Sequence, residues 1–201
     1  MKEQEVFVLA DRALNDVVGQ IKQDQWAMTM SNMFAMGGAE PVTLRQVVNG
    51  HAHDDAWLPD MLAGRTMSEV GEDKWSGDIL GDNPTASFAI FVNAACEAAQ
   101  ALDEPEQTVH CSFGDYTARQ YLWQVTAFRG MRAYDIAVDL DLDPTLPDEL
   151  VTGMWEQLTP VADEWRGYGV FGPKVEVPED APLMDRLLGL TGRQPRAAGS
   201  A

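Results

Sequence analysis

Residues 43–62 read TLRQVVNGHAHDDAWLPDML, and this stretch decides the fold class. Thr43 and Gln46 have the form of a capping box, in which each side chain accepts from a backbone N–H at the start of a helix. We therefore predict a helix from Thr43 to about residue 63. It should kink or break at Pro59, whose ring clashes with the preceding turn, and end at Gly64. One face of this helix is apolar and consists of Leu44, Val47, Val48, Leu58 and Leu62.

Five further segments show the same helical period of apolar residues. They are expected at about 4–23, from 83–84 to about 102, at 117–141, from 147 to about 165 and at 181–190, with a short β-like piece at 108–113. Amphipathic helices joined by modest loops bury their apolar stripes best against one another. The sequence thus predicts an all-α helical bundle as a single domain over residues 1–192, followed by a disordered tail over 193–201.

The composition argues against several classes of partner. The 201-residue chain has 14 basic and 32 acidic residues, which gives a formal net charge of −18. Nucleic acid is bound by clustered Lys and Arg, of which this sequence has none, and an anionic membrane surface would repel the chain. No apolar stretch approaches the ~20 residues of a membrane helix. The N-terminus has no signal-peptide pattern, and Cys96 and Cys111 form no disulfide framework. We expect a cytoplasmic protein.

Two of the predicted helices direct polar side chains into the core. At about 100° per residue, His51 falls at the centre of the apolar arc of helix 43–63, and Asp55 lies beside it. In helix 117–141 the arc is centred on Phe128 and includes Arg132 and Asp135, which are close enough to pair. These inward residues form either a satisfied buried network that fixes helix register or a pocket between helices, where bundles often build metal and ligand sites.

Several separated blocks of the sequence, in order, carry a family resemblance. They are 10–14, 25–26, 43–45, 47–49, 113–115 and 134–137, and near the end Phe171-Gly172-Pro173, 177–182, 185–188 and 190–193. In these blocks the chain resembles the DinB-like metal-binding proteins, and in particular the N-terminal domain of mycothiol-dependent maleylpyruvate isomerases and its short single-domain branch. The resemblance covers nearly the whole chain, and it implies a DinB-like four-helix bundle with additional C-terminal helices.

The resemblance also implies a site. It predicts a divalent metal, zinc or similar, held by a His on the second helix and by a Glu and a His spaced E-x-x-x-H on the fourth. Such a metal would lower the pKa of a bound thiol, as in mycothiol or a similar cofactor. This chain departs from that pattern, because the first His position falls on Gly50, one residue before His51, and the other two positions hold Phe128 and Arg132. One good ligand of three does not hold zinc tightly.

Two interpretations of the site follow from these departures. In the first, the metal site has been lost and Arg132 supplies the positive charge, pairing with Asp55 or Asp135 or holding an anionic ligand. In the second, a metal is bound by a different set, namely His51 and Asp55 with Asp135 or His110.

Two functions are compatible with this sequence. The first is a thiol-dependent transferase or isomerase acting on a small anionic molecule, with His51 as metal ligand or base and Arg132 as anion clamp. The second is a non-catalytic bundle that binds a small molecule or dimerises and whose inward polar residues are structural. The missing Glu and His favour the second function, and a homodimer is the default assembly for a small bundle.

Overall fold

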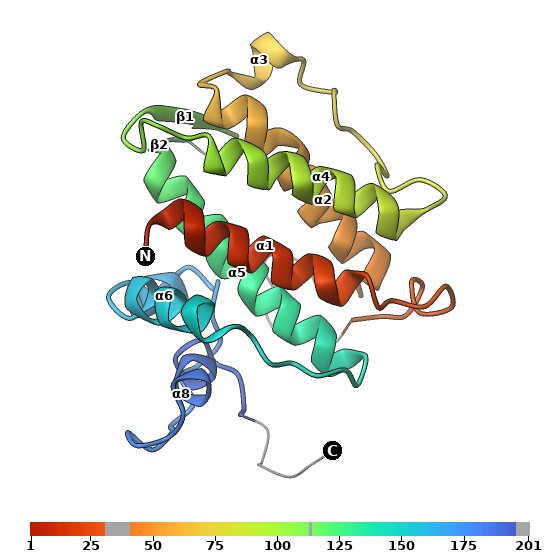
Figure 1. Ribbon diagram of the computed structural model, residues 1–201. Helices are drawn as coiled ribbons and strands as arrows, with labels where there is room; N and C mark the ends of the chain where they lie inside the picture. Colours follow the sequence, from red (N-terminus) through yellow and green to blue (C-terminus); the bar gives the residue numbers. More distant parts are fainter. Residues whose placement is uncertain (31–40, 113, 196–201) are drawn as a thin grey trace. The chain divides into compact units, whose positions relative to one another are not determined.

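The computed structural model describes residues 1–30, 41–112 and 114–195. Within these ranges the chain is mostly helical and has one two-stranded antiparallel sheet (Figure 1). The predicted all-α class is therefore confirmed at the level of a mostly helical chain. No helix in the described part combines the length and the apolar character needed to cross a membrane.

The chain divides into two compact units. The first comprises Met1–Met30 and Val42–Leu146, and the second contains the described residues from Pro147 to Pro195. The single domain expected over residues 1–192 stays a prediction. Each unit is described separately below.

Four long helices build the first unit: α1 (Glu3–Val18), α2 (Leu44–Leu62), α4 (Pro84–Gln100) and α5 (Ala118–Asp139). Helix α1 packs against both α4 and α5, and α2 packs mainly against α4, whereas α2 and α5 touch each other at fewer places. The short helix α3 (Met67–Val70) and the hairpin of β1 (Thr108–Cys111) and β2 (Gly114–Thr117) lie in the connections. Figure 1 shows the hairpin leading directly into α5.

The helix starts follow the capping chemistry of the sequence. The side chains of Thr43 and Thr117 accept from the backbone N–H groups three residues later, so the predicted capping box at Thr43 is confirmed and α5 begins with a second one. Asn83 caps α4, with Pro84 at its first position. These side chains satisfy N–H groups that have no partner within the helix.

Two helix boundaries differ from the expectation. Helix α1 ends at Val18 and not near residue 23, because Gly19 caps it and the chain then turns. Helix α2 continues through Pro59 to Leu62, so the chain does not break there. Pro59 lies in the last turns of α2, where the missing N–H removes a single hydrogen bond of the helix.

An apolar cluster joins α1, α2, α4, β1 and α5. It includes Phe7, Leu58, Ala95, Val109 and Leu122, each with no exposed surface. Full burial of a large apolar side chain contributes about 1.5–3 kcal/mol relative to exposure. This cluster fixes how the four long helices pack and so positions the polar side chains described below.

The second unit contains α6 (Asp148–Leu158), α7 (Ala162–Gly167) and α8 (Leu183–Leu190), and α8 packs on α6. The single helix expected from 147 to about 165 is therefore two helices, separated by a turn at 159–161. The predicted tail starts at Arg193, but this residue is 4% exposed and its backbone N–H donates to Leu188 at 2.8 Å. The tail residues 196–201 lie outside the described residues.

Two glycines allow a close approach inside the second unit. A Cβ on Gly189 would lie 2.6 Å from the carbonyl oxygen of Val175, whose N–H donates to Gly189 at 3.0 Å. Gly192 has φ +82°, and a Cβ there would lie 2.9 Å from the backbone of Gly172. Only glycine fits such contacts without displacing the backbone.

We predict that Gly189→Ala lowers the free energy of unfolding of the second unit by about 1–3 kcal/mol, because the added methyl group overlaps a backbone carbonyl. Urea denaturation together with amide hydrogen exchange of residues 147–195 measures the effect. The matched control is Gly167→Ala, since a Cβ there meets nothing within 4 Å. Equal stability of the two variants would contradict the close approach.

Candidate functional site

A fully buried arginine occupies the core of the first unit. The Nε atom of Arg129, on α5, lies 3.0 Å from Oδ1 of Asp11 on α1 and 3.0 Å from Oδ1 of Asp55 on α2. Nη2 also donates to Asp55 Oδ1, and Nη1 donates to the carbonyl oxygen of Val125 at 3.3 Å. The ring of Phe7 lies 5.4 Å from Cζ, within range of a cation–π contact.

The second oxygens of the two carboxylates have different surroundings. Asp11 Oδ2 accepts from the thiol of Cys96 on α4 at 3.6 Å. Asp55 Oδ2 is buried and has no hydrogen-bond partner among the described residues. We call Asp11, Asp55, Cys96 and Arg129 the core ion cluster. It joins one residue from each of the four long helices.

The core ion cluster contains two carboxylates and one guanidinium, so it carries an extra negative charge when all three are ionised. Burial raises the pKa of Asp55 well above its usual value; Arg129 opposes this shift, and the charge of Asp11 adds to it. Burial likewise raises the pKa of Asp11, again against Arg129. Burial and the charge of Asp11 raise the pKa of Cys96 to about 12, so its thiol stays protonated at neutral pH.

His51 lies one helical turn before Asp55 on α2. Its Nδ1 atom is buried and has no hydrogen-bond partner within the described ranges, although the residue as a whole is partly exposed. Burial lowers the pKa of His51 well below its usual value, and the positive charges of Arg132 and Arg129 lower it further. The imidazole is therefore neutral at pH 7, with one ring nitrogen able to donate and the other able to accept.

The structure corrects the predicted arrangement of α5. Phe128, the expected centre of the apolar arc, is 37% exposed. Arg132 is partly exposed, and the residue that pairs with Asp55 is Arg129. Asp135 is buried, as expected. The positive charge of Arg132 nevertheless acts on His51, whose pKa it lowers.

The predicted metal ligands do not come together as a metal site. Among the described residues, no group of three or more His, Cys, Asp or Glu side chains could hold a metal ion, so His51, Asp55 and Asp135 do not form one. His110 is engaged elsewhere, on β1, where its Nδ1 lies 2.8 Å from Asp115 Oδ1. The residues present therefore do not fit the metal centre that the resemblance implies.

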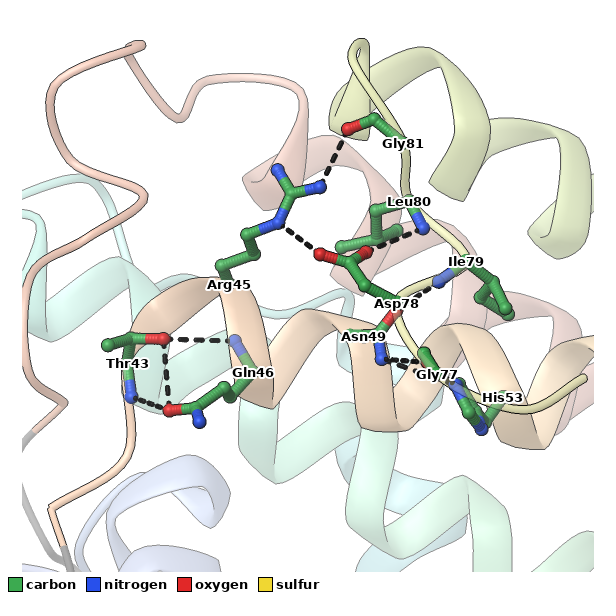
Figure 2. Close-up of polar contacts among 10 residues, drawn as sticks. All are labelled: Thr43, Arg45, Gln46, Asn49, His53, Gly77, Asp78, Ile79, Leu80 and Gly81. Atoms are coloured by element: carbon green, nitrogen blue, oxygen red, sulfur yellow. Dashed lines mark hydrogen bonds and ion pairs between the residues drawn. The ribbon is translucent and has the colours of Figure 1, made fainter.

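The opposite side of α2 is used to hold a loop. Arg45 pairs with Asp78 at 2.6 Å and donates to the carbonyl oxygen of Gly81. Asn49 accepts from the N–H of Ile79, and Nε2 of His53 lies 2.7 Å from the carbonyl oxygen of Gly77 (Figure 2). Because a carbonyl oxygen only accepts, Nε2 of His53 is the donor. His53 therefore helps to hold residues 77–81 against α2.

Sequence reasoning missed Asp11 and Arg129. Asp11 follows the buried Phe7 by four residues and precedes the buried Leu14 by three. Arg129 follows Val125 by four residues and precedes Ala133 by four, and both neighbours are buried. These spacings lie on the inward stripes and were the available signal.

We predict that the stability of the Asp55→Asn variant, measured relative to the natural chain, increases as the pH rises. The folded pKa of Asp55 lies above its unfolded value of 3.8. The folded state therefore binds more protons than the unfolded state, and the free energy of unfolding falls as pH rises from about 4 through the folded pKa, by up to about 1.4 kcal/mol per pH unit. The amide of Asn does not titrate, so the variant lacks this pH dependence. Urea denaturation of the natural chain and of Asp55→Asn between pH 4.5 and 8 measures the difference in their free energies of unfolding.

Asp78→Asn is the matched control, with the opposite sign. The hydrogen bond from Arg45 lowers the pKa of Asp78, so its contribution is present above pH 3.8 and is lost only at lower pH. The decrease in the free energy of unfolding caused by Asp78→Asn should therefore stay constant between pH 4.5 and 8. If the cost of Asp55→Asn is also constant over this range, the pKa of Asp55 is not raised in the folded protein.

Comparisons with protein-family models, with curated proteins and with solved structures give no match to this chain.

Proposed function

We propose that this protein is a DinB-like four-helix bundle that has lost the family metal and binds a small anionic molecule beside His51 and Arg132. The observation that carries the proposal is the neutral imidazole of His51. Its buried Nδ1 has no partner among the described residues, and the charge of Arg132 acts on the imidazole. Such a pair offers a hydrogen-bonding atom next to a fixed positive charge.

The partial exposure of both residues supports this location. Arg129 is enclosed by the core, whereas His51 and Arg132 both retain contact with solvent. An arginine near the surface can bind a carboxylate or phosphate in bidentate fashion.

A thiol-dependent transferase or isomerase is the second candidate, and the same imidazole favours it. Because its pKa is lowered, His51 is available as a proton acceptor at neutral pH. Burial raises the pKa of Cys96 to about 12 and that of Cys111 to about 11, so neither thiol is ionised. A thiolate nucleophile would therefore come from an added thiol of the mycothiol type.

We predict that maleate, used as a small dicarboxylate, binds at His51 and Arg132. Titration followed by NMR should shift the imidazole resonances of His51 and leave those of His53 unchanged, since His53 is held by the 77–81 loop. Arg132→Ala should weaken binding at least about tenfold, equivalent to about 1.4 kcal/mol.

Arg119→Ala is the control, because Arg119 lies on the same helix and pairs with Glu3 and Glu106 instead. If maleate binds the Arg132→Ala variant as well as the natural chain, the proposed site is wrong. Adding a low-molecular-weight thiol with maleate, and following the isomerisation of maleate to fumarate, tests the enzyme candidate separately from binding.

A further inference from the structure

In the core ion cluster, two buried carboxylates surround one cationic side chain. Two fully buried carboxylates, from α1 and α2, point their Oδ1 atoms at the same guanidinium nitrogen, each at 3.0 Å. The thiol of Cys96 lies against one carboxylate, and the other keeps a buried oxygen without a partner in the described part of the chain. Buried carboxylates in such proximity repel each other unless a positive charge lies between them.

We infer that the core of the first unit is a cation site that the chain fills with its own side chain, so that Arg129 takes the place of an exchangeable metal ion. Asp11 and Asp55 are the anionic walls of this site. The inference concerns the core and does not depend on the proposed function at His51 and Arg132.

The arrangement explains why the expected metal ligands are missing. A divalent ion and a buried guanidinium would compete for the same carboxylates, and like charges this close are strongly unfavourable in a low-dielectric core. Arg129 holds its two carboxylates through three donor contacts and is attached to α5, so it cannot dissociate. The folded protein then has no need of a divalent metal, unlike small metal-dependent domains, which unfold when a chelator removes the ion.

Removal of the guanidinium should reopen the site. In Arg129→Ala, two carboxylates face the space left by the side chain, and added cations should bind there. The test measures urea unfolding of the natural chain and of the variant with EDTA, then with methylguanidinium, Mg²⁺ or Zn²⁺ at matched ionic strength. The natural chain should show the same midpoint in every condition.

The Arg129→Ala variant should unfold at much lower urea, and at least one of the three cations should restore it. At a cation concentration of 100 times its dissociation constant, the folded-to-unfolded ratio should rise about a hundredfold. If the variant does not fold without a cation, the same comparison is made on the yield of refolded protein. Added cations should stabilise the double variant Arg129→Ala/Asp55→Asn less, because one of the two carboxylates has been replaced by a neutral amide.

Arg119→Ala controls for the general binding of cations to this acidic chain, since Arg119 is an exposed arginine of the same helix. A response of Arg129→Ala no larger than that of Arg119→Ala to all three cations would overturn the inference. Loss of structure of the natural chain in EDTA would also overturn it, because the fold would then depend on a metal.

Discussion

The hydrogen-bonded ion pairs of Arg129 are the constraint on which the first unit depends. The guanidinium bonds to α1 through Asp11 and to α2 through Asp55, and Asp11 in turn accepts from Cys96 on α4. Removal of one partner from a buried pair leaves an uncompensated charge and costs about 3–5 kcal/mol. Because all four long helices meet in this cluster, a slip of any one along its axis would break a charged hydrogen bond, which fixes the register of the helices.

The same cluster determines the electrostatics around His51. Arg129 and Arg132 are three residues apart on α5, and both charges act on the imidazole. Arg129 is fully buried and bonded to Asp11 and Asp55, whereas Arg132 is partly exposed. The buried cluster thus has a structural role, whereas the proposed ligand site lies at His51 and Arg132.

The sequence predicted α2 well and α5 poorly, and the difference has a physical reason. Helix α2 is covered on one side by the core and on the other by the 77–81 loop, held through Arg45 and Asn49, so its inward face is narrow. The inward positions of His51 and Asp55 could therefore be read from spacing alone. Helix α5 is buried around most of its circumference. A helical wheel then has no single apolar direction, and centring it on Phe128 selected Arg132 as the inward arginine in place of Arg129, which lies three residues earlier.

The partner of a buried charge is harder to predict than its position. Asp11 and Arg129 are 118 residues apart, and Asp55 and Arg129 are 74 apart. Spacing along one helix says which side chains share a face, but the choice of partner is made by the packing of α1 against α5 and of α2 against α4. The partner can be inferred from electrostatic balance. Two inward carboxylates require a cation in the core, and Arg129 lies on the inward stripe of α5 at the level of both. The imbalance of inward charges across the helices therefore indicates this cluster, whereas the spacing expected of metal ligands does not.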